Sequence, residues 1–232
     1  PKGAPSIFEY DGNDLLIRSL DRRGGERLYQ YDENLKLTGE RDPLGLWTRY
    51  GYDASCRRTV MTDTAGFVTR YTYDDAGSLL TTADPTGATT RYTYDANRNI
   101  IAVTNALGHT TRMVYDAANR LKFMMDANGN RTEYCYDAED QLIRTIGPRG
   151  EVTDYTYDAQ GRLSAVKDPL GNVTRYAYDA AGQRSAITDP LGRRTDYGYD
   201  PLGRLARVER PALEGGERPT TQFGYDAVGN TV

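Results

Sequence analysis

The chain has 232 residues, 38% of them hydrophobic and 27% charged, and a formal net charge of −4. That length allows one large domain or two small ones, the longest purely apolar stretch (residues 100–103) is too short for a membrane span, and the negative charge argues against a general binder of nucleic acids or anionic membranes. Two cysteines and a single histidine are too few for a disulfide scaffold or a histidine-built metal site.

The dominant feature of the sequence is a repeat. The chain holds 19 Tyr and 24 Gly beside 4 Phe and 1 Trp, and the dipeptide Tyr-Asp returns every 21 residues without a gap from residue 10 to residue 199. The pairs after the first two, taken as structural repeat positions, are Tyr52-Asp53, Tyr73-Asp74, Tyr94-Asp95, Tyr115-Asp116, Tyr136-Asp137, Tyr157-Asp158, Tyr178-Asp179 and Tyr199-Asp200. A further pair at 225–226 follows after five extra residues, so we expect one repeat domain over residues 1–232 with an insertion loop at about 209–219.

Each repeat predicts a turn, a strand, a second turn and a second strand, when its Tyr is numbered position 1. Asp158-Ala159-Gln160-Gly161 has Asp first and Gly fourth, which predicts a turn whose glycine takes positive φ beside a bulge. Apolar residues at positions 7 and 10 (Leu163 and Val166) form the next strand, and their spacing of three predicts a bulge or a break.

The second turn of the repeat carries Asp, Pro and Gly at the places that a type I turn favours, as in Asp168-Pro169-Leu170-Gly171. Its glycines keep the 21-residue register; those taken as structural positions are Gly45, Gly87, Gly171 and Gly192. The strand after it alternates Thr at position 18, an aromatic residue at position 20 and the next Tyr, which is the period of a β-strand.

Each 21-residue unit is therefore a β-hairpin. A lone hairpin is marginal in water, so consecutive units are expected to pair into one antiparallel sheet. The sequence predicts an all-β fold of about ten hairpins, roughly 20 to 22 short strands, in a curved or spiralling sheet.

The unit at residues 157–176 closely resembles the YD repeat of bacterial Rhs proteins, which also occurs in insecticidal toxin-complex subunits and animal teneurins. The resemblance covers essentially the whole chain, because the period, both turns and the Thr-x-aromatic-x-Tyr-Asp string agree. It implies a segment of a hollow, spiralling β-shell that encloses a C-terminal toxin domain in bacteria, or of a barrel in an adhesion receptor.

One family motif is matched only in part. Rhs shells end in P-x-x-x-x-D-P-x-G-L, which is linked to self-cleavage; residues 42–46 fit its second half, but Leu37 stands where the proline belongs. We interpret this stretch as an ordinary repeat turn.

The resemblance implies a structural, non-catalytic role: the wall of a polymorphic-toxin shell that holds a toxic effector apart until delivery. Its expected partners are other segments of the same shell, the enclosed C-terminal toxin domain and secretion spike or chaperone proteins, as in type VI secretion, with no nucleic acid, no membrane span and no cofactor. Such a protein is made in the bacterial cytoplasm and exported.

An enzymatic alternative finds little in the sequence. The register aspartates stand one per unit at the start of a turn, His109 occupies a position that is otherwise variable and polar, and Cys56 and Cys135 fall at different repeat positions. We predict no catalytic, cofactor-binding or metal-binding residue.

The tyrosines allow two interpretations. With arginine beside them at position 19, they could form a carbohydrate-binding face of a secreted aromatic-repeat module, for which Tyr50 and Tyr71 are the residues to test. The favoured interpretation is a ladder of tyrosines stacked between hairpins, with arginines on the opposite face meeting cross-strand carboxylates. A teneurin-like adhesion barrel is the remaining alternative.

The terminal strands, near Ser6–Tyr10 and Thr221–Asp226, are expected to leave backbone groups unpaired. We therefore expect them to pair with other segments of the same shell or with another copy of the chain.

Overall fold

The computed structural model describes residues 5–212, 216–226 and 229, and these form strands and turns only. No helix long and apolar enough to cross a membrane occurs among them. The strands are β1 (Ile7–Tyr10), β2 (Leu16–Leu20), β3 (Glu26–Tyr31), β4 (Leu37–Arg41), β5 (Trp47–Tyr52), β6 (Arg58–Thr62), β7 (Val68–Tyr73), β8 (Leu79–Ala83), β9 (Thr89–Tyr94), β10 (Ile100–Thr104), β11 (Thr110–Tyr115), β12 (Leu121–Met125), β13 (Arg131–Tyr136), β14 (Leu142–Ile146), β15 (Val152–Tyr157), β16 (Leu163–Lys167), β17 (Val173–Tyr178), β18 (Arg184–Thr188), β19 (Arg194–Tyr199), β20 (Leu205–Glu209) and β21 (Thr220–Gln222).

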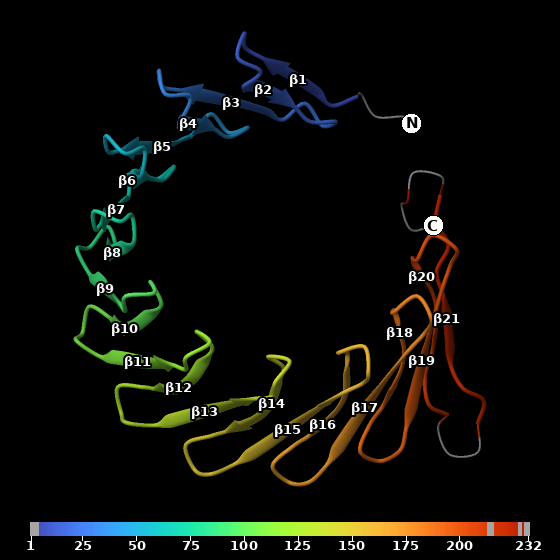
Figure 1. Ribbon diagram of the computed structural model, residues 1–232. Coiled ribbons are helices and arrows are strands. Elements are labelled where there is room, and N and C mark those ends of the chain that lie inside the picture. The colour runs from blue at the N-terminus through green and yellow to red at the C-terminus, as the bar shows by residue number, and fades with distance from the viewer. Residues whose placement is uncertain (1–4, 213–215, 227–228, 230–232) are drawn as a thin grey trace. The chain divides into compact units, whose positions relative to one another are not determined.

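The strands belong to one antiparallel sheet of 21 strands, which confirms the predicted all-β hairpin architecture. Two compact units divide the chain: residues 1–120 with 125–128, and residues 121–124 with 129–232. In the first, each strand from β1 to β11 pairs with its neighbour in sequence, and in the second the same holds from β13 to β21. Within each unit successive strands turn progressively, so each is a curved sheet (Figure 1).

The predicted bulge lies early in the five-residue strand of each hairpin. In the pairing of β9 with β10, Tyr94 faces Ile100 while Thr93 faces Ala102, so Ile101 is the extra residue. The same shift recurs in eight other hairpins, for example between Thr156 and Tyr157 in β15. It restores the register that apolar residues three apart would otherwise lose.

The pairing gives the sheet two chemically different faces. The tyrosine face carries positions 1, 7, 10, 18 and 20 of the repeat; the polar face carries positions 9, 11, 17, 19 and 21. In β9 these are Thr90, Tyr92 and Tyr94 on the first face and Thr89, Arg91 and Thr93 on the second. Residues 90, 92 and 94 are half-buried, whereas Arg91 and Thr93 are exposed.

The described part of the sheet has almost no core. Ala186 and Val208 are the buried hydrophobic residues of the described part of the chain, and the accessible surface is 15561 Å². A compact monomer of 25.9 kDa would expose about 10,500 Å². The hairpins are therefore held by contacts within the sheet.

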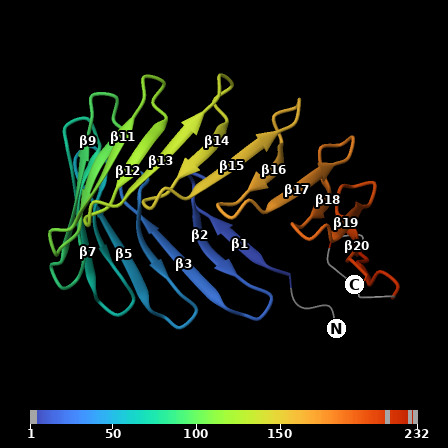
Figure 2. The same cartoon turned by 90° about the horizontal axis from the view of Figure 1, so that it is seen from below.

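The two turns of each repeat lie at opposite edges of the sheet, because consecutive strands run in opposite directions (Figure 2). One edge collects the Tyr-Asp turns and the other collects the Asp-Pro-Leu-Gly type of turn. Strands β20 and β21 are joined by the longest connection, residues 210–219, of which 213–215 lie outside the described residues.

Candidate functional site

The Tyr-Asp turn is built around one carboxylate. In the turn at residues 158–162, Asp158 Oδ1 accepts from the backbone N–H groups of Gln160 (3.0 Å) and Arg162 (2.9 Å). The Asp158 carbonyl accepts from Gly161 N–H at 3.0 Å, and the Asp158 N–H donates to the Arg162 carbonyl at 2.9 Å. One aspartate thus satisfies the backbone of the whole turn, as an Asx turn does.

The same carboxylate contact recurs at each Tyr-Asp pair that the sequence singled out. The Oδ1 atom accepts from the N–H four residues on at Asp53, Asp74, Asp95, Asp116, Asp137, Asp158, Asp179 and Asp200. The aspartates of the motif therefore lie in turns, one hairpin apart.

The fourth residue of this turn, position 5 of the repeat, has a left-handed backbone. Gly161 has φ 76°, as the turn pattern predicts, but Leu35 (61°), Cys56 (59°) and Arg98 (66°) adopt the same conformation without being glycine. The hydrogen bonds of the preceding aspartate hold these residues in a conformation that costs an L-residue about 1–2 kcal/mol.

The second turn uses the same construction. Asp168 Oδ1 accepts from Leu170 N–H (2.9 Å) and Asn172 N–H (2.8 Å), and Gly171 has φ 87°. The other register glycines also have positive φ: Gly45 (87°), Gly87 (87°) and Gly192 (79°). In the turn at 42–46, Asp42 Oδ1 likewise accepts from the N–H groups of Leu44 and Leu46, as expected of an ordinary repeat turn.

The tyrosine of the motif joins one hairpin to the preceding one. The hydroxyl of Tyr94 donates to the carbonyl of Leu79, 15 residues earlier, at 2.8 Å. The equivalent bond is made by Tyr31, Tyr52, Tyr73, Tyr115, Tyr136, Tyr157, Tyr178 and Tyr199, and by Tyr225 to Leu205 across the insertion. Sequence reasoning missed this bond and proposed stacked rings; the signal was the invariant hydroxyl, since Tyr, never Phe, stands at position 1.

Arginine at position 6 strengthens this contact between consecutive hairpins, called the joint from here on, in several repeats. Arg162 Nε lies 2.8 Å from Asp158 Oδ2, and its guanidinium carbon lies 4.6 Å from the ring centre of Tyr178 in the next repeat. Arg57 and Arg204 bridge Asp53 to Tyr73 and Asp200 to Tyr225 in the same way. The guanidinium is therefore held between a carboxylate and an aromatic face.

These contacts shift the pKa values of the groups concerned. The Arg162 side chain, followed by the turn N–H groups, lowers the pKa of Asp158, and Arg120 does the same for Asp116. Burial raises the pKa of the Tyr94 and Tyr157 hydroxyls. All four groups keep the charge state that their structural bonds require at neutral pH.

Arginine–carboxylate pairs cross the strands on the polar face, as the tyrosine-ladder interpretation predicted, but their arginines are not those at position 19. Arg18 contacts Glu9 (2.6 Å) and Glu26 (2.7 Å), and Arg144 contacts Asp154 (2.6 Å). The arginines at position 19, Arg49, Arg70, Arg91, Arg112 and Arg175, are exposed instead. The arginines of these pairs, Arg18 and Arg144, stand at position 9 instead. At position 19, Arg112 and Arg175 face the small residues Ala102 and Ala165 across the strands.

The other residues weighed in the sequence lie apart from one another. His109 is exposed, Cys56 and Cys135 are half-buried free thiols, and no group of three or more His, Cys, Asp or Glu in the described part of the chain could hold a metal ion. Tyr50 and Tyr71, the residues chosen to test carbohydrate binding, lie on either side of Arg58, whose guanidinium is 5.7 Å and 5.1 Å from their ring centres.

Comparison with known proteins agrees with this geometry. The model of the teneurin YD-shell family matches residues 49–197. Among solved structures, TcdB2-TccC3 without its hypervariable C-terminal region matches 100% of this chain at a TM-score of 0.71 and 17% identity, and TcdB2-TccC3 itself matches 98% at 0.69 and 17%. The Tc holotoxin pore of Photorhabdus luminescens matches 98% at 0.57 and 16%.

At these identities the solved structures establish the fold alone, and the chain spans about 15% of the length of the chains it matches. No curated protein sequence matches it. The family model covers well over half of the chain, including seven of its Tyr-Asp turns (residues 52 to 179). This chain therefore belongs to the teneurin YD-shell family.

Proposed function

We propose that this chain is a segment of the wall of an Rhs-type toxin shell, which encloses a C-terminal toxic effector domain before delivery to a target cell. The observation that carries the proposal is the use of the motif itself: the Tyr hydroxyl binds the preceding hairpin and the Asp carboxylate holds the turn. A motif used in this way in repeat after repeat makes a continuous wall.

The exposed surface of the sheet supports the same role. A curved single layer with almost no core of its own suits a partition between two compartments better than a compact domain. The partners we propose are further segments of the same shell, the enclosed toxin domain and secretion spike or chaperone proteins, in a protein exported from the bacterial cytoplasm.

We propose no reaction for this segment, since the repeated carboxylates are committed to backbone N–H groups and arginines. A carbohydrate-binding module and an adhesion barrel are the rival functions. A glycan array with the wild-type chain and its Tyr71→Ala variant separates the first rival, because only a sugar-binding face would lose a signal on this substitution.

Limited proteolysis of the natural protein that contains this chain tests the wall directly. We expect the domain after the repeats to resist protease in the intact protein and to be digested once the hairpins are unfolded by mild urea. Digestion at the same rate in the intact protein as in the separately expressed domain would contradict the proposal.

A further inference from the structure

The arginine joints provide an internal template for a binding site. Where position 6 is arginine, its guanidinium lies between the turn carboxylate and the tyrosine of the next repeat: Arg204 is 2.7 Å from Asp200 Oδ2 and 4.4 Å from the centre of the Tyr225 ring. Arg57 and Arg162 repeat the arrangement at 5.2 Å and 4.6 Å from Tyr73 and Tyr178. The repeat thus forms a guanidinium site at this joint and fills it with its own side chain.

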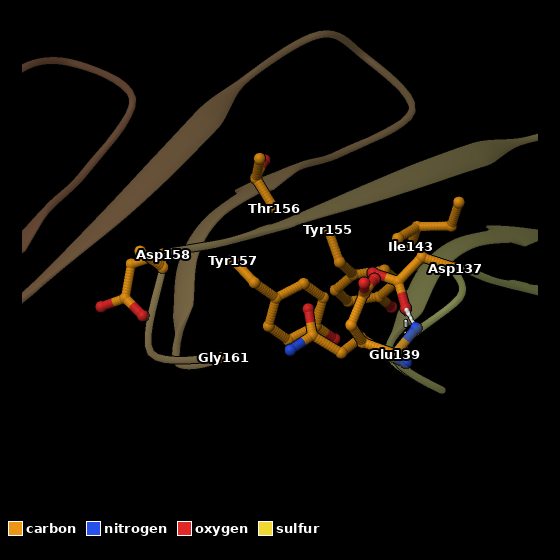
Figure 3. A pocket seen from close by; sticks show the side chains of 10 residues that line it. Asp137, Glu139, Ile143, Tyr155, Thr156, Tyr157, Asp158 and Gly161 are labelled. Atoms are coloured by element: carbon orange, nitrogen blue, oxygen red, sulfur yellow. Dashed lines mark hydrogen bonds between the residues drawn. The ribbon is translucent and has the colours of Figure 1, made fainter.

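Two joints of the second unit have glutamine, Gln141 and Gln183, in place of the arginine. Position 6 of the repeat beginning at Tyr136 is Gln141, and an open groove of about 460 Å³ lies there. Residues lining it include Asp137, Glu139, Tyr155 and Tyr157. Figure 3 shows the Tyr155 and Tyr157 rings and the Glu139 and Asp137 side chains on the same side of the strand, while Thr156 points to the other side.

The side chain of Gln141 extends toward the next turn. Its Nε2 atom lies 2.8 Å from the place that a Cβ on Gly161 would occupy, so a side chain at that position would require the Gln141 amide to move. The equivalent Gln183 reaches the Gly203 carbonyl at 2.7 Å. The side chain at position 6 is therefore a neutral amide here, in contrast to Arg57, Arg162 and Arg204.

We propose that this groove binds the guanidinium group of an arginine side chain from another polypeptide, held over Tyr157 and beside Glu139. A planar guanidinium fits an aromatic face and a carboxylate together, which an ammonium does less well. Free arginine carries a carboxylate of its own that would lie among the acidic groups of this turn, so an arginine within a peptide is the favoured ligand. This inference goes beyond the wall function and does not depend on it.

The test is an NMR titration of the chain with ¹³C-labelled tyrosine rings. The probe is N-acetyl-L-arginine amide, and its control is N-acetyl-L-citrulline amide, which has the same shape without the charge. We expect the arginine probe to shift the Tyr157 and Tyr155 signals and the citrulline probe to leave them unchanged; free arginine should bind more weakly than its amide. No shift with the arginine amide, or equal shifts with the citrulline amide, would overturn the proposal.

Two variants make the test specific. Gln141→Arg gives this joint the side chain of its neighbours, so it should fold and should abolish the shifts at Tyr157. Arg162→Gln should leave Tyr178 unresponsive, because Gln160 stands where the Gln141 groove has Glu139. If the Tyr157 shifts persist in the folded Gln141→Arg variant, the guanidinium does not bind in this groove. If Glu139→Gln leaves the affinity unchanged, the assignment of that carboxylate is wrong.

Discussion

The carboxylate of Glu151 fills the place of a side chain that Gly147 lacks. Position 12 is aspartate or asparagine in the other repeats from residue 21 to residue 189, and its carboxylate or amide oxygen holds the turn. At Gly147, Glu151 Oε2 instead accepts from Arg149 N–H at 2.8 Å, and a Cβ on Gly147 would lie 2.5 Å from Glu151 Cδ. The turn therefore keeps its acceptor by moving it four residues along the chain.

This exchange predicts coupled substitutions. Gly147→Asp alone should lower the urea midpoint because the new side chain meets Glu151, and Glu151→Ala alone should lower it because the turn loses its acceptor. Gly147→Asp combined with Glu151→Asn gives Asp-Pro-Arg-Gly-Asn, which differs from the turn at residues 168–172 only in Arg149 for Leu170, and should recover at least the wild-type midpoint. Additive losses in the double variant would show that the two residues act separately.

The tyrosine hydroxyl is predicted to stabilise each joint between hairpins. Tyr94→Phe leaves the Leu79 carbonyl without its donor and should cost about 1 kcal/mol of unfolding free energy. Tyr10, which begins the first repeat and is 57% exposed, offers a matched control, and Tyr10→Phe should be nearly neutral. Urea unfolding followed by circular dichroism measures both; equal effects would argue against the joint.

The turn carboxylates predict a loss of stability in acid. The folded-state pKa values of Asp53, Asp116, Asp158 and Asp200 are lowered, so their contribution is complete above the ordinary carboxyl pKa of about 3.9 and disappears as pH falls through the lowered values. Thermal melting between pH 7 and pH 2 should show a flat region that ends below about pH 4. In Arg162→Gln, the ¹³C carboxyl signal of Asp158 should titrate at a higher pH than in the wild type, since Arg162 is the main cause of the shift.

Left-handed backbone at position 5 predicts opposite effects of two exchanges. Leu35 has φ 61°, so Leu35→Gly should stabilise the chain by up to about 1 kcal/mol after the greater freedom of the unfolded glycine is allowed for. Gly77 has φ 91° with open space around its Cβ position, so Gly77→Leu should destabilise by a similar amount through the backbone alone. Changes in the free energy of unfolding, relative to the wild type, that have the same sign in both variants would contradict this.

The first strand predicts self-association of the isolated chain. β1 pairs on one side with β2, and its residues Ile7, Phe8 and Tyr10 are exposed. Phe8→Lys should shift sedimentation toward the monomer, because charge on an edge strand opposes pairing with another copy. At the other end Phe223 is half-buried and its N–H donates to Ala206, so Phe223→Lys should also weaken β21 itself. A monomeric wild-type chain would refute this prediction.

Most of the fold could be predicted from the sequence because the same alternation and the same turn residues recur in each repeat. Period-two alternation around Tyr92 and Tyr94 gave the strand, and the spacing of Leu163 and Val166 gave the bulge. The hydroxyl present at every position 1 indicated a hydrogen-bond donor, but its acceptor at Tyr94, the Leu79 carbonyl, was not predictable in this way, since a backbone carbonyl carries no sequence signal. The positive φ of Leu35 was hidden for a related reason: the aspartate three residues earlier imposes it, against the preference of leucine.

The sequence predicted that arginines would pair with carboxylates, but not which arginines would do so. Composition alone could not show that Arg162 contacts its own Asp158 and the next repeat's Tyr178 together, because that contact depends on how consecutive turns stack along the edge of the sheet. The groove at Gln141 is recognised as a candidate site only by comparison with the joints that carry arginine at position 6.

Cryo-electron microscopy of the natural protein that contains this chain tests the central claim most directly. The account predicts a hollow shell in which these hairpins lie in the wall, paired with further repeats, around density for an enclosed polypeptide. A structure in which this sheet closes on itself around a filled core, or leaves both faces in open solvent with no enclosed chain, would contradict it.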